Sequence, residues 1–292
     1  MFTCPPILPY FTPLPALSLQ GEANLGIPAW LAAVEADLDK ALASGTPIRQ
    51  VVMGRCCAID SMMEALFELY ELDQTDLTLF ATGGYGRGEL HPFSDVDLLL
   101  LSPNPIDEAL NQKISPFVAK LWDIGIDPAL VVRSVEECDE ACHDDITVAT
   151  SLLEARILAG NVAQAGLPMQ LLNKNWSQTK FYEAKMAEAK ERYLKHNSTE
   201  YNLEPDLKNA PGGLRDIHTV GWISKRYFRV TNLFGLVQQE FITEKEFDEL
   251  QEAEDFLWLI RHHLHKIAKR NENRVLFDYQ RLIAERIGYR DN

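Results

Sequence analysis

A glycine-rich turn between two short apolar runs constrains the fold of this chain more than any other segment. The first run is Leu77–Ala81, and a Gly-Gly pair follows it closely. The second run, Val96–Leu101, begins beside two acidic residues spaced two apart, Asp95 and Asp97. Residues i and i+2 of a strand point to the same face, so these carboxylates are expected to stand side by side. The pattern predicts two strands connected through the glycine turn.

The turn has the composition of a phosphate-binding segment. Gly83 and Gly84 bring backbone amides close to an anion without steric obstruction, and the N-terminus of the predicted following helical turn favours negative charge. The planar guanidinium of Arg87 suits the same phosphates. A tight turn alone would explain the glycines, but the Ser94-Asp-Val-Asp run some ten residues later favours a binding site, with Ser94 at its start.

Asp95 and Asp97 predict a metal site. Like charges placed next to each other on a strand repel, so a purely structural role would be destabilising without a cation. Mg²⁺ is held by a few carboxylates together with substrate phosphates, and two such ions stabilise the attacking and leaving oxygens of an in-line displacement. A phosphate cradle followed by this carboxylate pair indicates nucleotidyl transfer.

Composition limits the alternatives. The chain has 292 residues, 46% of them hydrophobic, and a formal net charge of -15. This acidity disfavours nucleic acid as a partner, because nucleic-acid-binding proteins usually display clustered positive charge. No apolar run approaches the roughly 20 residues that cross a bilayer, and no signal-peptide pattern opens the chain. Five cysteines without a disulfide-scaffold pattern favour a reducing compartment, so we expect a cytoplasmic protein with no membrane partner.

The predicted elements change character along the chain. Strands at Leu77–Ala81, Val96–Leu101 and Ile126–Arg133 alternate with helical segments and predict a small mixed α/β sheet. From residue 138 onward every predicted element is a helix. We expect an N-terminal arm and helix over 1–46, an α/β core over 47–137 and a helical domain over 138–292. The predicted helices are Pro28–Ser44, Pro47–Tyr70, a turn near Gly86–Leu90, Asp107–Ile124, Thr147–Ala159, Gln164–Lys174, Gln178–His196, Leu214–Val230, Glu244–Arg270 and Tyr279–Ile287.

Four segments carry a resemblance to a known family. The run from Gly83 to Leu99, with its Gly-Gly-Tyr-Gly-Arg-Gly-Glu-Leu and Ser-Asp-Val-Asp-Leu-Leu motifs, resembles the DNA polymerase β-type nucleotidyltransferases. The segments Asp145–Arg156, Asn202–Asp216 and Arg274–Gln280 resemble the bifunctional PII uridylyltransferase/uridylyl-removing enzymes, in their nucleotidyltransferase region. The likeness extends from about Val51 to the end.

The resemblance implies a polymerase β-like α/β core followed by a helical domain. It also implies Mg²⁺-dependent transfer of UMP from UTP to a tyrosine of the nitrogen-regulatory PII protein, with release of pyrophosphate. Members of that family continue into an HD-type phosphohydrolase domain and paired ACT domains. Neither is recognisable in this chain, so we expect a truncated protein that carries transfer and not removal.

Sites of this family usually have a third carboxylate on a neighbouring strand, as a base or a metal ligand. Asp127, at the start of the third predicted strand, is our candidate, and Asp123 and Glu136 compete with it. Lys208 and Arg215 flank the Pro-Gly-Gly turn before a predicted helix, where they could contact the triphosphate. A helix-start turn explains the same residues equally well.

Two other clusters are better explained by packing or solvation. His262 and His265 lie one helical turn apart, but the basic residues around them disfavour a cation, so a solvated basic face is expected. Cys138 and Cys142 lack a second ligand cluster of zinc-site type, and helical packing is expected.

Alternatives to uridylyl transfer remain at this point. The same fold could use another nucleotide or acceptor, as a protein adenylyltransferase does. It could also be a non-catalytic nucleotide-sensing domain.

Overall fold

The computed structural model describes Leu14 and residues 26–196, 202–230 and 232–290, so the rest of the expected N-terminal arm lies outside the described residues. The chain divides into two compact units. The first contains the described residues up to Leu90 together with Ser94–Asn175, and the second contains His91–Phe93 and the described residues from Trp176 onward.

The first unit is built on a mixed sheet of four strands in the order β3-β2-β1-β4. Strand β1 pairs antiparallel with both β2 and β4, whereas β2 and β3 run parallel. Leu98–Leu101 of β2 are all buried, as expected for a strand covered on both faces. The small mixed α/β sheet predicted from the sequence is confirmed. The strands are β1 (Thr78–Ala81), β2 (Val96–Ser102), β3 (Pro128–Ser134) and β4 (Arg156–Gly160).

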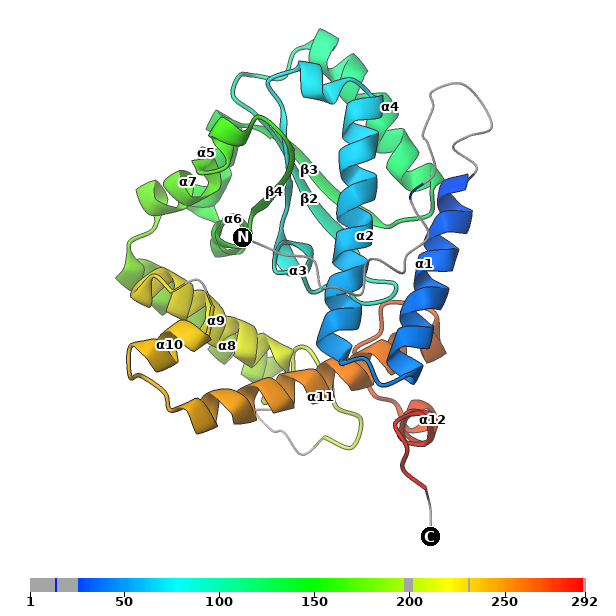
Figure 1. The fold of residues 1–292 in the computed structure, drawn as a ribbon. Coiled ribbons are helices and arrows are strands. Elements are labelled where there is room, and N and C mark those ends of the chain that lie inside the picture. The colour runs from blue at the N-terminus through cyan, green and yellow to red at the C-terminus, as the bar shows by residue number, and fades with distance from the viewer. Residues whose placement is uncertain (1–13, 15–25, 197–201, 231, 291–292) are drawn as a thin grey trace. The chain divides into compact units, whose positions relative to one another are not determined.

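Helices surround this sheet, and α1 and α2 run side by side (Figure 1). The ring of Phe117 in α4 meets Phe67 of α2 edge to face, with ring centroids 6.4 Å apart. Both rings are fully buried, so they join the two helices through apolar contact. The helices of this unit are α1 (Gly26–Ala43), α2 (Ile48–Leu69), α3 (Gly83–Gly86), α4 (Glu108–Asp123), α5 (Val135–Asp144), α6 (Ile146–Leu153) and α7 (Leu167–Asn175), with 3₁₀ turns η3 (Leu72–Gln74) and η4 (Val162–Gln164).

Strand β4 corrects the helix predicted over Thr147–Ala159. The helical part ends at Leu153, and residues from Arg156 onward pair with β1. A Cβ atom on Gly160 would lie 2.2 Å from the Leu77 carbonyl oxygen, so glycine is needed where the strand closes against the chain before β1. Pairing with β1 outweighs the helical preference of the Ile-Leu-Ala sequence.

The first unit therefore extends to Asn175, whereas the sequence predicts that the helical domain begins at residue 138. Strand β4 returns the chain to the sheet after α5 and α6, which places both helices in the first unit. The short helix after β1 also begins earlier than predicted, at Gly83 instead of near Gly86.

The second unit consists of helices. A core of Leu207, Leu264, Val275 and Ile283 joins the loop before α9 to helices α11 and α12. Thr243 and Glu246 form a reciprocal capping box at the start of the long helix α11. The elements are α8 (Gln178–Lys195), α9 (Leu214–Ile223), the π-helical turn η5 (Ser224–Phe228), α10 (Phe234–Gln238), α11 (Glu244–Ala268) and α12 (Phe277–Arg286).

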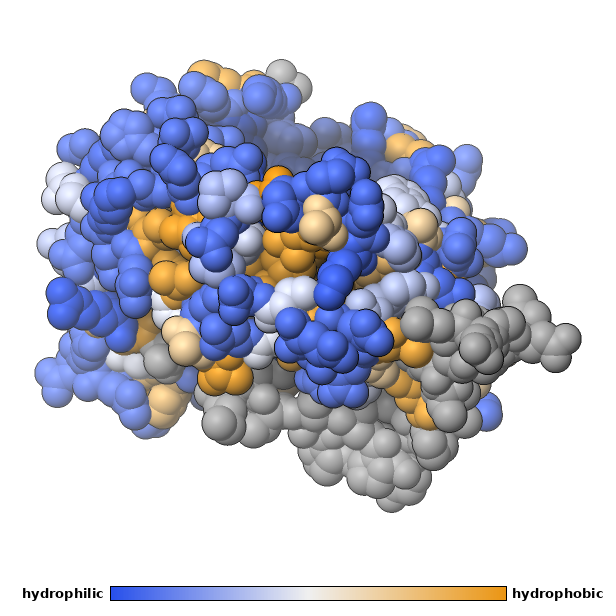
Figure 2. Space-filling view, turned by 90° about the horizontal axis from the view of Figure 1, so that it is seen from above, coloured by the Kyte–Doolittle hydropathy of each residue, from blue (hydrophilic) through white to orange (hydrophobic). Residues whose placement is uncertain are grey.

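One face of the molecule is mainly polar. Figure 2 shows one face on which hydrophilic residues cover most of the area and apolar residues form smaller patches between them. Among the described residues, none of the helices combines the length and the apolar character that a membrane crossing requires.

Candidate active site at the edge of the sheet

At one edge of the sheet, the one that runs across the strand ends, the end of β1 lies beside the starts of β2, β3 and β4. The predicted site residues of the first unit lie at this edge. The pairing of β1 with β2 and β4 matches Ala81 at the end of β1 with Leu98 and Arg156, near the starts of the other two strands. Strand β3 begins at the same edge, because it runs parallel to β2 and Val96 pairs with Pro128. Helix α3 follows β1 at this edge of the sheet (Figure 1).

The glycine turn lies directly against one predicted metal ligand. Gly83 has a φ of +53°, in the left-handed region, and a Cβ atom built on it would lie 2.3 Å from Oδ2 of Asp97. The Thr82 amide also donates to the Asp97 carbonyl oxygen at 3.0 Å. Only glycine fits between the turn and this carboxylate. The structure therefore brings together Gly83 and Asp97, which the sequence placed in one site.

The three carboxylates predicted to hold metal lie at the same edge. Asp95 immediately precedes β2 and is exposed, whereas Asp97 is half-buried within the strand. Asp127 is exposed and immediately precedes β3, and its carbonyl oxygen accepts from the Val96 amide at 2.8 Å. Extending the parallel register by one residue places Asp127 opposite Asp95. Exposed carboxylate oxygens are the hard donors that Mg²⁺ prefers, so the residues present fit this ion.

The competing carboxylates lie elsewhere in the first unit. Asp123 is the last residue of α4, and its charge acts on Tyr70 at the end of α2, where burial first and then this carboxylate raise the tyrosine pKa. Glu136 lies in the first turn of α5, after the far end of β3. Neither borders the start of β2, which favours Asp127 as the third carboxylate.

Ser94 and Gly84 are two further predicted contacts of the nucleotide. The Ser94 hydroxyl oxygen is buried and has no hydrogen-bond partner among the described residues. Buried hydroxyls normally have a partner, so this one has capacity for a water or a ligand atom. On the turn itself, a Cβ atom on Gly84 would lie 3.3 Å from the Glu89 carbonyl oxygen, which is a tight fit.

Arg87 forms ion pairs with two carboxylates of the first unit. Its guanidinium donates to both carboxylate oxygens of Glu89, each at 2.8 Å, and to Glu154 at 3.4 Å. Burial opposes the charge, but the two carboxylates outweigh it and raise the pKa of Arg87. Sequence reasoning missed Glu89 and Glu154. Nothing local in the sequence indicates that Glu154 reaches α3.

Lys208 and Arg215 belong to the second unit. Arg215 lies over the Trp222 ring at 5.3 Å from its centroid. Asp216 accepts from the Gly212 amide at 2.8 Å and from Arg192 at 2.5 Å, which closes the Pro-Gly-Gly loop at the start of α9. A helix-start turn accounts for these contacts, and the triphosphate role of Lys208 and Arg215 stays a prediction.

The solvated basic face predicted around His262 and His265 is wrong. Both imidazoles are buried, at 1% and 0% exposure. Nδ1 of His265 pairs with the Pro92 carbonyl oxygen, and its ring lies 6.1 Å from that of His91. The helical period is correct, but the neighbouring basic residues do not keep this face in solvent, and Arg261 is itself buried. The packing expectation for Cys138 and Cys142 is confirmed, since both side chains are buried in α5.

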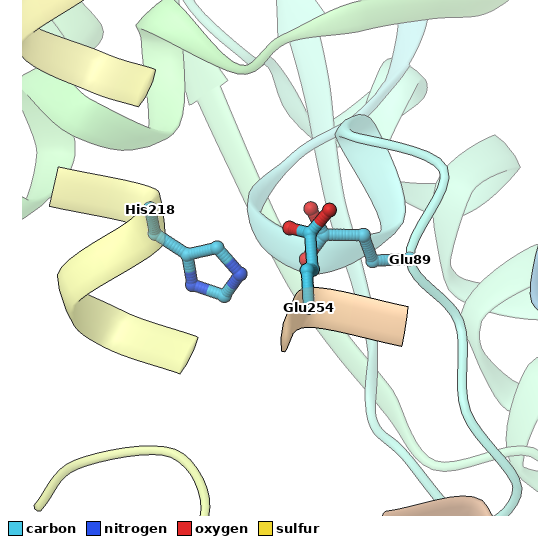
Figure 3. A group of neighbouring side chains, drawn as sticks. All are labelled: Glu89, His218 and Glu254. Carbon is cyan, nitrogen blue, oxygen red and sulfur yellow. The ribbon is translucent and has the colours of Figure 1, made fainter. Parts of the chain in front are cut away.

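Helices α9 and α11 of the second unit meet through a polar pair. Figure 3 shows His218 of α9 pointing toward Glu254 of α11, and their possible ligand atoms lie within 4.8 Å. Glu89, also drawn there, belongs to the first unit. The pair by itself has too few ligands for a metal site.

Comparison with known proteins agrees with this division of the chain. Residues 62–151 match the family described as nucleotidyltransferase domain, and residues 180–292 match the family described as GlnD PII-uridylyltransferase. Domains of the first kind generally use a nucleotide substrate and a divalent metal. The mixed sheet agrees with a polymerase β-like nucleotidyltransferase core. One solved structure, a toxin-antitoxin with AMP-PNP, aligns over 46% of this chain and 96% of that one, at 15% identity and a TM-score of 0.27, which is too low to support an argument.

Curated relatives match nearly the whole chain. It is 59% identical to a bifunctional uridylyltransferase/uridylyl-removing enzyme of Psychrobacter sp. (strain PRwf-1), over 99% of this chain and 32% of that protein. The enzymes of the same name from Psychrobacter arcticus and Acinetobacter baumannii are 54% and 49% identical, over 99% and 89% of this chain and 33% and 29% of theirs. The chain thus spans about a third of the length of these relatives. It belongs to the family of the bifunctional uridylyltransferase/uridylyl-removing enzymes, within which it carries the nucleotidyltransferase domain.

Proposed function

We propose that this chain transfers UMP from UTP to a tyrosine hydroxyl of the PII signalling protein and releases pyrophosphate. The observation that carries the proposal is the contact of the Gly83 turn with Asp97, at the edge where Asp95 and Asp127 also lie. A turn that opens a short helix beside these carboxylates suits a nucleoside triphosphate bound with its counter-ions. Family membership supports uridylyl transfer among the reactions that such a site could perform.

Each residue at the edge has a proposed task. The amides of Gly83 and Gly84 bind phosphate oxygens, and the Ser94 hydroxyl donates to the same group. Asp95, Asp97 and Asp127 would hold two Mg²⁺ ions, which when bound offset the charge of the phosphates and of the leaving pyrophosphate. We retain Lys208 and Arg215 as candidate contacts of the triphosphate.

The acceptor side of the reaction needs a base. The tyrosine oxygen forms the new bond to the α-phosphorus, while the bond from that phosphorus to the oxygen bridging to the β-phosphate breaks. The proton of the tyrosine hydroxyl is taken up by a carboxylate, for which we propose Asp127, because it is exposed on the strand beside the Asp95–Asp97 pair. The use of UTP as donor implies a cytoplasmic location.

Labelling separates this proposal from its alternatives. The purified chain would be incubated with Mg²⁺, a PII protein and UTP, ATP, CTP or GTP labelled at the α-phosphate. We expect label on PII from UTP, and none when the PII acceptor tyrosine is replaced by phenylalanine. Labelling by ATP alone would show a protein adenylyltransferase. Tight nucleotide binding without transfer from any nucleotide would indicate a sensing domain instead.

A further inference from the structure

The aromatic residue of the phosphate-binding turn is held by a largely buried ion pair. The Tyr85 hydroxyl donates to Oδ1 of Asp60 in α2 at 2.7 Å. Arg156, the first residue of β4, donates to both carboxylate oxygens of Asp60 at 2.8 and 3.0 Å and to the Tyr85 carbonyl oxygen at 3.4 Å. Tyr85 is 1% exposed and Asp60 8%. The network ties α3 to α2 and to the start of β4, because a bidentate guanidinium fixes direction as well as distance.

A second ion pair holds the end of the same turn. Arg87 directly follows α3 and bridges Glu89 and Glu154. The side chain of Glu154 is 1% exposed and that of Arg87 is 13% exposed. Separating a carboxylate this deeply buried from its guanidinium is costly, so the bridge resists opening.

Between these two pairs the backbones touch directly. A Cβ atom on Gly86 would lie 2.3 Å from the Glu154 carbonyl oxygen and 3.0 Å from that of Ala81. The turn is therefore seated on the backbone before β4, with no room for a side chain. Three consecutive residues, Tyr85, Gly86 and Arg87, contact the segment Glu154–Arg156.

From these contacts we infer that Glu154 and Arg156 are positioning residues that clamp the phosphate-binding turn in place beside Asp97. The inference rests on the proposed function, since it assumes that the turn binds the nucleotide. Neither residue needs to touch the nucleotide. The clamp acts through α3, and it fixes the amides of Gly83 and Gly84 relative to the Asp97 carboxylate. Small misplacements of binding groups weaken such sites strongly, and locked neighbours prevent them.

Two variants test the clamp from its two ends. Arg156→Lys keeps the charge but loses the fork that spans both oxygens of Asp60, and Glu154→Gln removes the carboxylate that faces Arg87. Tyr85→Phe deletes only a hydroxyl and serves if either variant fails to fold. Glu35→Gln is the matched control. It weakens a bidentate pair of the same unit, in which Arg55 of α2 donates to Glu35 of α1 at 2.5 and 2.7 Å.

The first readout needs no nucleotide. The Gly86 amide donates to the Thr82 carbonyl oxygen at 2.7 Å and the Arg87 amide to that of Gly83 at 3.2 Å. We expect hydrogen exchange of these amides to be about tenfold faster in the clamp variants and unchanged in Glu35→Gln. The second readout is the Kd of Mg-UTP, which we expect to rise about tenfold in the clamp variants and to stay unchanged in the control.

The outcomes separate the two proposals. The clamp would be overturned if Arg156→Lys and Glu154→Gln were folded and showed the same amide hydrogen exchange and the same affinity for Mg-UTP as the unmodified chain. An equal change in Glu35→Gln would also overturn it, because the effect would then be general loosening of the unit. If the unmodified chain moves no UMP to PII while the clamp variants alter exchange and Mg-UTP affinity, the clamp stands and the proposed transfer reaction fails.

Discussion

Gly83 and Asp97 are in such close apposition that a single added Cβ atom on the glycine would lie 2.3 Å from the carboxylate oxygen Oδ2. The turn and the carboxylate come from the end of β1 and the start of β2, which are antiparallel neighbours. A phosphate bound by the turn amides would thus lie beside the Asp97 carboxylate. This contact makes the edge of the sheet a candidate catalytic centre.

Gly83→Ala is the most direct test of that contact. The methyl group would displace Asp97 or the turn, and we expect UMP transfer to fall by about 100-fold or more. Gly45→Ala is the control, because Gly45 also has a positive φ, of +91°, but no atom within 4 Å of the added carbon. It should cost about 1 kcal/mol of stability from backbone strain and leave transfer unchanged. Initial rates of UMP transfer and urea unfolding of both variants measure these effects. A normal transfer rate in Gly83→Ala would disprove the site.

The carboxylates give a second prediction. Asp95→Asn and Asp97→Asn each remove a charged ligand, and we expect at least about a 100-fold loss of transfer with the fold retained. Direct titration with Mg²⁺ and UTP should show weaker metal binding in both. If Asp97→Asn labelled PII at the normal rate, the metal assignment would be wrong.

Three variants test which residue supplies the third carboxylate. We expect Asp127→Asn to reduce kcat for UMP transfer, because Asp127 adjoins the start of β2 through its bond to Val96. Asp123→Asn and Glu136→Gln should retain the normal rate, since these residues lie at the end of α4 and in α5. A large loss in either of them, with Asp127→Asn unaffected, would transfer the role to that residue.

His265 predicts a pH dependence of stability. Burial, together with the Arg261 guanidinium, lowers the pKa of His265 from 6.5 to about 3. Below pH 6.5 the unfolded chain therefore gains a proton that the folded chain rejects. The free energy of unfolding should fall as the pH drops from 6.5 toward 3, by up to about 1.4 kcal/mol per pH unit, with no contribution above 6.5.

Urea unfolding between pH 5 and 7.5 measures this slope. His265→Gln should reduce this slope by up to about 1.4 kcal/mol per pH unit. His143→Gln alters an exposed residue of α5 and should leave the slope unchanged. Equal slopes in the unmodified chain and in His265→Gln would contradict the burial argument.

The apolar core of the first unit gives a stability prediction. Phe117→Ala removes a fully buried ring that contacts Phe67 and Tyr70, and we expect a loss of about 3–5 kcal/mol in the free energy of unfolding. Trp122→Ala, on the same helix, changes a side chain in a residue that is 58% exposed and should alter stability by about 0.5 kcal/mol or less. The midpoint of urea unfolding measures both, and similar losses in the two variants would contradict the packing described here.

Local patterns in the sequence determined the strands β1 and β2, the long helices and the composition of the turn. These features depend on the spacing of apolar residues, on glycine and on neighbouring carboxylates, all of which act within a few residues. The mixed sheet and the pair Asp95 and Asp97 could therefore be predicted.

Tertiary structure alone decided the rest. The sequence allows the helix that begins near Thr147 to continue to Ala159, but residues 156–160 form β4 because β1 offers them hydrogen bonds. Arg87 is bound to Glu154, and Arg156 to Asp60, which lies 96 residues away along the chain. His262 and His265 looked solvated from their neighbours and are buried by the packing of the second unit. The sequence by itself determined which chemical groups are present, and the tertiary structure decided which of them meet, because contacts between distant residues depend on how the whole chain packs.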